Sequence, residues 1–262
     1  MEFQTVSGMN QSMLSRRTVA RTMSICFISM MVLLLGAVAH YISEVRSARE
    51  ATPALVQNAW QRFGKQVKYT DLSPQQGAIL LAVEDPAFFR HHGIDLTTPG
   101  AGMTTITQGL VKLLYFPGGF EPGLAKIRQS LIAQYALDAL VSKNEQLDLL
   151  LNMAYMGSRD GKPIHGFANA AKQFFGKELG ALSDAEFQAL VAMLIAPNQL
   201  PPGSPAHAER MRRIDAYLSG QVQPASVLDV RYDGKAHGSL GEEALMALLR
   251  VITNAQPADG NR

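Results

Sequence analysis

The sequence contains little cysteine, little net charge and little of the alternating pattern that marks β-strands. Its 262 residues include a single cysteine, Cys26, so no disulfide within the chain is possible and the fold must rest on its hydrophobic core. The net charge of +2 gives no indication of a nucleic-acid partner. Hydrophobic residues make up 47% of the chain, a globular composition. The scarcity of alternating segments predicts a mainly α protein.

One segment is free of charged residues. Residues 23–42, MSICFISMMVLLLGAVAHYI, contain no Asp, Glu, Lys or Arg and are long enough for a helix to cross about 30 Å of hydrocarbon. We therefore predict a transmembrane helix, with a buried core helix or a cleaved signal peptide as alternatives. Because Arg16, Arg17 and Arg21 precede this segment, the positive-inside rule predicts that residues 1–22 are cytoplasmic and the bulk of the chain lies outside.

The sequence pattern divides the rest of the chain into three segments. Residues 43–72 are interpreted as a juxtamembrane stalk, residues 73–220 as a helical domain, and residues 221–262 as a tail. The tail is expected to contain one short helix at 241–254 and to end in a polar, disordered stretch. Within the domain, the segment SRDGKPIHG at 158–166 is predicted to be a loop.

The most informative stretch is EDPAFFRHHG, residues 84–93. Ser73 as N-cap and Pro74 at the first helical position predict a helix, which should end near Glu84 because the residue before a proline avoids the helical region. A carboxylate there, next to the apolar run GAILLAV, is a candidate general base because burial and the helix C-terminus both raise its pKa. The simpler alternative is a pair of helix-end capping residues.

Two histidines of this stretch, His91 and His92, lie close to Asp95 in sequence. Their spacing matches no common zinc pattern and no cysteine accompanies them. We therefore expect ordinary loop histidines and no metal site.

Further motifs follow in a fixed order: GMTTITQGLVKL at 102–113, KIRQSL at 126–131 and KNEQLDLLLN at 143–152. This order resembles glycosyltransferase family 51, the peptidoglycan glycosyltransferases, over roughly residues 53–218. The first family motif, E-D-x-x-F-x-x-H-x-G, is complete here, as Glu84, Asp85, Phe88, His91 and Gly93.

The resemblance implies a lysozyme-like helical domain that polymerises lipid II into glycan strands, as a monofunctional enzyme. It assigns Glu84 as the base that takes the proton of the acceptor 4-hydroxyl, with basic residues such as Lys112 stabilising the lipid pyrophosphate that leaves. The residues expected to bind substrate are Asp85, Phe88, His91, Thr105, Thr107, Gln108, Lys112, Lys126 and Ser130. Arg90, Arg128 and Lys143 are further basic candidates.

The third motif departs from the family pattern R-K-x-x-E-A. The family's second glutamate falls on Ser130, and Lys126 and Ile127 replace the arginine and lysine; in the second motif Gly109 replaces a glutamine and Leu113 an asparagine. The departures leave two interpretations. One is a divergent enzyme, and the other is a module without efficient turnover that recruits lipid II or another cell-wall protein. They also weaken the family expectation of a divalent cation such as Mg²⁺. A lytic enzyme is a third alternative, disfavoured because cutting a glycan involves no pyrophosphate and would not need Lys112.

The family also implies a location and partners. A membrane anchor suits a lipid-linked substrate, because both are confined to one membrane surface. We expect a single-pass protein of the bacterial inner membrane with its catalytic domain in the periplasm. The expected partners are lipid II, nascent glycan strands, the membrane and other cell-wall synthesis proteins.

Overall fold

The computed structural model describes residues 5–121 and 123–253. The chain separates into two compact units, with the division after Glu44. Helix α1 (Thr5–Phe63) forms the first unit and continues into the second. Its portion Val19–Phe63 includes a window apolar enough to cross a membrane by length and composition, and no part of that window is buried. This agrees with the apolar helix predicted at residues 23–42.

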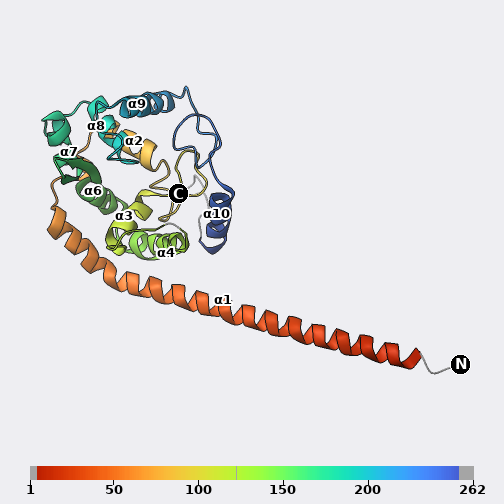
Figure 1. Cartoon of the computed structure of the whole chain (residues 1–262). Coiled ribbons are helices and arrows are strands. Elements are labelled where there is room, and N and C mark those ends of the chain that lie inside the picture. Colours follow the sequence, from red (N-terminus) through yellow and green to blue (C-terminus); the bar gives the residue numbers. More distant parts are fainter. Residues whose placement is uncertain (1–4, 122, 254–262) are drawn as a thin grey trace. The chain divides into compact units, whose positions relative to one another are not determined.

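Helices form most of the regular structure of the second unit (Figure 1), which confirms the predicted mainly α class. Its elements after α1 are η1 (Tyr69–Asp71), α2 (Pro74–Glu84), α3 (Ile106–Tyr115), α4 (Leu124–Ile132), η2 (Ala133–Leu137), α5 (Asp138–Leu140), α6 (Lys143–Met153), β1 (Tyr155–Arg159), β2 (Lys162–His165), α7 (Phe167–Phe175), η3 (Leu179–Ala181), α8 (Asp184–Met193), α9 (Pro205–Leu218) and α10 (Leu240–Ile252).

The helix boundaries follow local capping chemistry. Ser73 caps α2, and its side chain accepts a hydrogen bond from the Gln76 amide at 3.1 Å. Ser183 and Glu186 form a capping box at the start of α8. Helix α2 ends at Glu84, as the proline that follows two residues later predicts.

The core forms where α2 packs against α8 and α9, and where α3 packs against α4 and α6. Phe167 and Phe187 are fully buried in it, with ring centroids 5.6 Å apart. Burial of each such side chain contributes about 1.5–3 kcal/mol. The domain half of α1 joins this core through Ala48, Val56 and Ala59. The structure therefore packs part of the predicted stalk, residues 43–72, together with the domain predicted at 73–220.

A π-helical turn, η2, lies between α4 and α5. Gly93 lies against this turn at a φ of +79°. A Cβ atom at this position would come within 2.6 Å of the Ala133 carbonyl oxygen. The glycine of the first motif is therefore required both by its backbone conformation and by this close approach.

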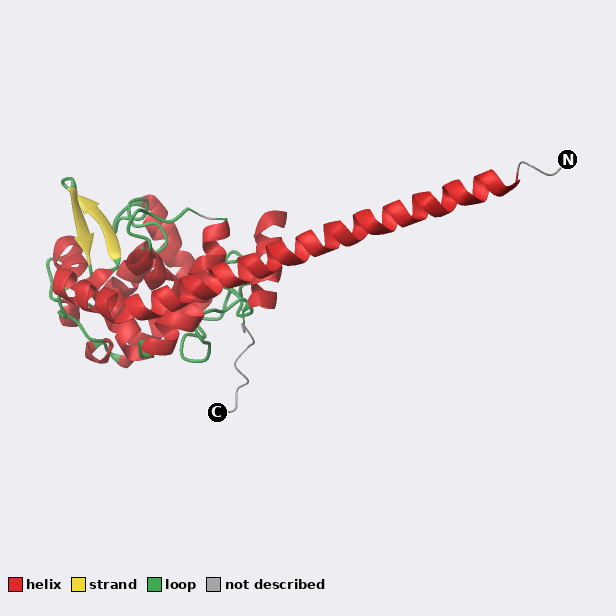
Figure 2. Cartoon of the chain, turned by 90° about the horizontal axis from the view of Figure 1, so that it is seen from below, coloured by secondary structure: helices red, strands yellow, loops and turns green. Residues whose placement is uncertain are grey.

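The predicted loop at 158–166 is wrong in part, because residues 155–165 form an antiparallel hairpin, β1–β2. Figure 2 shows it as a small yellow ribbon among red helices. Asp160 and Gly161 connect the strands, and both have positive φ, 51° and 73°. An Asp-Gly pair is a strong hairpin signal, since it tolerates the left-handed conformation that a tight two-residue turn requires.

Residues 221–253, most of the predicted tail, belong to the same compact unit as the domain. The amides of Gly100 and Gly102 donate to the carbonyls of Ser226 and Val227, at 2.9 and 2.7 Å. Helix α10 provides the expected short helix. The polar end predicted to be disordered, from residue 254, lies outside the described residues.

Candidate active site

A cavity of about 520 Å³ opens beside the end of α2. Its walls come from α2, the loop before α3, α3 itself, the end of α6, the segment after α8, α9 and the chain beyond residue 220. They are lined by Val83, Glu84, Ala101, Gly102, Met103, Thr104, Thr105, Ile106, Gly109, Lys112, Leu113, Leu150, Ala154, Tyr155, Leu194, Ile195, Pro197, Arg210 and Val230. Glu84 is the only carboxylate among the described residues that line it.

Glu84 is held at the C-terminal end of α2 in a poorly hydrated position. Burial raises its pKa from 4.5 to about 7, the nearby charge of Asp85 acts in the same direction, and Arg210 opposes them. A carboxyl group with this pKa is partly ionised near neutral pH. It can therefore accept a proton and still be basic enough to hold it.

Asp85 and His91 form the framework behind Glu84. The His91 Nε2 atom lies 2.9 and 3.0 Å from the two carboxylate oxygens of Asp85, and both side chains are buried. Asp85 also accepts the Ile106 amide at 3.0 Å, at the N-terminus of α3. A negative charge is stabilised there by the helix dipole. This arrangement fixes the turn after Glu84 to the first residue of α3.

The start of α3 is held by its own capping residues. Thr105 caps the helix by accepting the Gln108 amide at 3.1 Å, and its hydroxyl donates to the Gly93 carbonyl at 2.7 Å. Gln108 in turn donates to the Ser130 hydroxyl at 2.9 Å. The first, second and third motifs are thus joined by direct hydrogen bonds.

Two lysines bring positive charge to the cavity, one in its wall and one beside it. Lys112 of α3 lines it, and burial lowers its pKa. Lys126 of α4 donates to Thr104, a lining residue, at 3.0 Å. Burial, and secondarily the charge of Lys112, lower the pKa of Lys126 to about 7. Two amines in a poorly hydrated site repel each other, which favours a bound anion that neutralises both.

Several residues predicted to bind substrate lie away from the cavity wall. Phe88 is 1% exposed, and Thr107 is fully buried with its hydroxyl donating to Gln146 at 2.7 Å. Ser130, at the family's second glutamate, is fully buried. The structure thus places Glu84, Thr105 and Lys112 in the wall and Lys126 next to it. It places Asp85, Phe88, His91, Thr107, Gln108 and Ser130 in the supporting framework.

Sequence reasoning missed Arg210, which lines the cavity and lies close enough to Glu84 to affect its pKa. It belongs to the run AERMRR of α9, in which Arg212 and Arg213 pair with Glu209. The run indicates a basic helix face, but only packing decides which arginine reaches the cavity. Of the other basic candidates, Lys143 pairs with Asp138 at 2.6 Å.

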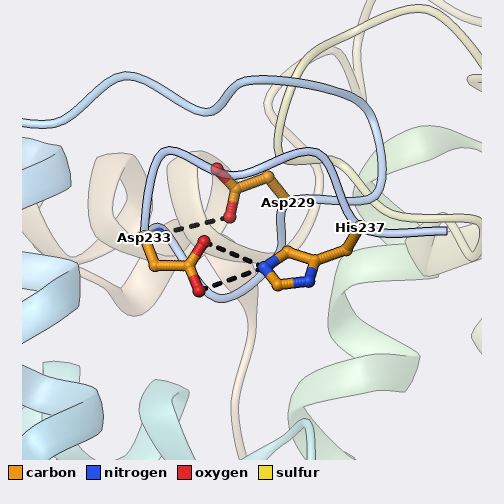
Figure 3. A group of neighbouring side chains, drawn as sticks. All are labelled: Asp229, Asp233 and His237. Atoms are coloured by element: carbon orange, nitrogen blue, oxygen red, sulfur yellow. Dashed lines mark hydrogen bonds and ion pairs between the residues drawn. The ribbon is translucent and has the colours of Figure 1, made fainter.

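The residues present do not fit a protein-bound divalent cation in the cavity. Divalent cations such as Mg²⁺ need several oxygen ligands, and Glu84 is accompanied there by the cations Lys112 and Arg210. A different group, Asp229, Asp233 and His237, brings three potential ligand atoms within 4.8 Å of one another (Figure 3).

These side chains are already engaged in organising a loop. Asp229 accepts three backbone amides, those of residues 225, 233 and 234, at 3.0–3.2 Å. Asp233 contacts the His237 Nε2 atom at 2.9 Å. Their hydrogen bonds explain the cluster without a metal ion.

Comparison with known proteins gives a consistent result. The chain is 32% identical over 148 residues to penicillin-binding protein 1A of Streptococcus oralis, covering 51% of this chain and 23% of the relative. It is 28% identical over 180 residues to penicillin-binding protein 1A of Haemophilus influenzae, covering 64% of this chain and 20% of the relative. It is 31% identical over 147 residues to penicillin-binding protein 1B of Buchnera aphidicola, covering 51% and 19%.

The chain thus matches about a fifth of the length of these relatives. Residues 53–220, more than half of the chain, match the family described as Transglycosylase. This range starts inside α1 and ends just after α9, and it contains the motif segments at residues 84–93, 102–113, 126–131 and 143–152. The chain therefore belongs to the transglycosylase family, glycosyltransferase family 51.

Proposed function

We propose that the chain is a peptidoglycan glycosyltransferase that polymerises lipid II into glycan strands. The single observation that carries the proposal is a half-buried glutamate with a pKa of about 7 in the wall of a cavity that Lys112 and Arg210 also line. This combination suits a reaction that removes a proton at one point and releases an anion at another.

In the proposed reaction, the 4-hydroxyl oxygen of the acceptor sugar attacks the anomeric carbon of the donor. Its proton passes to the carboxylate of Glu84, and the new carbon–oxygen bond replaces the bond to the lipid pyrophosphate. The pyrophosphate leaves with the electron pair of the broken bond. Lys112 and Arg210 stabilise its charge. Lys126, which contacts the lining residue Thr104, is a third cation near the leaving group.

The residues with a direct role are Glu84, Lys112 and Arg210, which line the cavity, and Lys126, which contacts the lining residue Thr104. Asp85, Phe88, His91, Thr107, Gln108 and Ser130 are assigned an indirect role, which is to hold Glu84 and the start of α3 in place. No divalent cation is assigned a step, because Glu84 lacks a second carboxylate beside it in the described cavity wall.

The proposed location follows from the substrate. The apolar portion of α1 would anchor the chain in the inner membrane, where lipid II is confined, with the domain on the periplasmic side. Nascent glycan strands and other cell-wall synthesis proteins are the proposed partners.

The test is polymerisation of labelled lipid II by the detergent-solubilised chain, with Glu84→Gln compared in parallel. Loss of a general base should lower the rate by about 10²–10⁴-fold. Glu178→Gln is the control, because Glu178 is an exposed residue whose partner is Lys172. Equal polymer from the wild type and Glu84→Gln would refute the assigned base.

A second candidate function is favoured by Ser130. This residue stands where the family has its second glutamate, is fully buried and is bonded to Gln108. The chain would then be a catalytically weakened module that binds lipid II or recruits another cell-wall protein. Lipid II binding without polymer from the wild type would support this alternative.

A further inference from the structure

Two tyrosines cap the end of the helix that carries Glu84. The last carbonyls of a helix lack partners within the helix and need other donors. The Tyr217 hydroxyl donates to the Ala82 carbonyl at 3.2 Å, and the Tyr232 hydroxyl donates to the Val83 carbonyl at 3.0 Å. The second of these bonds ends one residue before Glu84.

The two rings form a rigid pair. The centroids of Tyr217 and Tyr232 are 4.3 Å apart and their planes differ by 8°. The Arg210 guanidinium lies 4.9 Å from the centroid of the Tyr232 ring and also donates to the Val230 carbonyl. Tyr232 therefore contacts both the backbone beside Glu84 and the cation that acts on Glu84.

The loop between α9 and α10, residues 219–239, holds Tyr232 in an uncommon backbone conformation. Tyr232 is 2% exposed and has a φ of 55°, a region that L-residues rarely adopt. Asp229 binds the amides of residues on both sides of it, and Asp233 contacts His237 (Figure 3). A strained residue persists only where its surroundings fix it, and strain of this kind is concentrated at functional sites.

The same loop completes the cavity. Val230 lines the cavity wall, and the loop binds the amides of Gly100 and Gly102, which stand in the wall or next to it. All of these loop residues lie beyond residue 220, where the match to the transglycosylase family ends. The chain thus builds part of its active site from a segment outside the matched domain.

We propose that Tyr232 is a positioning residue that fixes Glu84 in the cavity by capping the preceding carbonyl of α2. This inference rests on the proposed role of Glu84 as the base. Without the hydroxyl, the Val83 carbonyl loses its donor and the last turn of α2 loosens. Water then reaches the Glu84 carboxyl group, and the distance from this carboxyl group to the acceptor hydroxyl is no longer fixed.

The test uses Tyr232→Phe in the full chain, which removes the hydroxyl and keeps the stacked ring. The Glu84 carboxyl is titrated by NMR in protein labelled with ¹³C at the glutamate side chains, and Glu84→Gln identifies its signal. We expect the pKa of Glu84 to fall by about one pH unit, because burial is the largest cause of its rise. In the polymerisation assay, kcat should fall by about tenfold with KM for lipid II unchanged.

Tyr115→Phe is the matched control. The Tyr115 hydroxyl bonds to Thr52 at 2.6 Å, and neither residue lines the cavity. It should lower the melting temperature as much as Tyr232→Phe does and leave the Glu84 titration unchanged. Asp229→Asn, which weakens the loop without altering Tyr232, should lower the pKa of Glu84 in the same direction by a smaller amount.

The outcomes are separable. If both tyrosine variants lose stability alike and neither shifts the Glu84 titration, Tyr232 is only structural and the inference is overturned. If the wild type makes no polymer, the proposed function fails, but the NMR titration still decides whether Tyr232 positions Glu84.

Discussion

Replacing Glu84 by glutamine should make the protein more stable at alkaline pH while removing its proposed activity. The carboxylate is held where burial disfavours its charge, and its pKa is about 7 in the folded chain. Glutamine has nearly the same shape and carries no charge. It therefore removes the cost of ionising a buried group, which the unfolded chain does not experience.

The size of this effect follows from the pKa. A rise from 4.5 to about 7 corresponds to roughly 3 kcal/mol, at about 1.36 kcal/mol per pKa unit. Because the carboxyl group also faces the open cavity, solvent screening reduces the expected gain to about 2 kcal/mol.

The pH dependence has a defined sign. Below pH 4.5 the carboxyl is protonated in both the folded and the unfolded chain, so Glu84→Gln has little effect. Between pH 4.5 and about 7 the unfolded chain ionises first, and the wild type loses stability relative to the variant. Above about pH 7 the difference is constant.

The assay is denaturant unfolding of the detergent-solubilised chain at pH 4.5, 6, 7 and 8.5. Glu186→Gln is a control of opposite sign, because hydrogen bonds from Lys177 and Ser183 lower the pKa of Glu186. It should destabilise the chain at neutral pH and have less effect as the pH falls through the lowered pKa. If Glu84→Gln is no more stable than the wild type at pH 8.5, the Glu84 carboxyl is not desolvated and the argument for its basicity fails.

Three further predictions concern Arg210, Lys126 and Gly93. Arg210→Gln should move the acid limb of the pH–rate profile up by about one pH unit, because Arg210 lowers the pKa of Glu84. Arg210→Lys keeps the positive charge and should restore the original acid limb. An acid limb that Arg210→Gln leaves unchanged would show that Arg210 does not act on Glu84. Lys126→Met should raise KM for lipid II by about tenfold or more, whereas Lys126→Arg, which keeps the charge, should be closer to the wild type in steady-state kinetics. Gly93→Ala should destabilise the chain by about 2 kcal/mol or more, because its Cβ would meet a backbone carbonyl at 2.6 Å at a φ of +79°. Gly109→Ala, in open space within α3, should instead stabilise it by up to about 1 kcal/mol in thermal unfolding, and equal effects of the two substitutions would contradict this account.

The sequence by itself determined the local features of this protein. Ser73, Pro74 and Pro86 act on neighbouring backbone groups, so they fix the bounds of α2 and bring Glu84 to its end. The spacing of the first motif identified the family for the same reason, because it depends on residues that are close in the chain. The Asp-Gly turn of the hairpin carried an equally local signal.

Only the tertiary structure decided which side chains share the cavity. Arg210 reaches Glu84 from α9, and Tyr232 binds the carbonyl of Val83 across 149 residues of sequence. Ser130 occupies a motif position but is buried against Gln108. Burial and distance between remote segments arise from packing of the whole chain, so neither the raised pKa of Glu84 nor its neighbours can be obtained from local pattern alone.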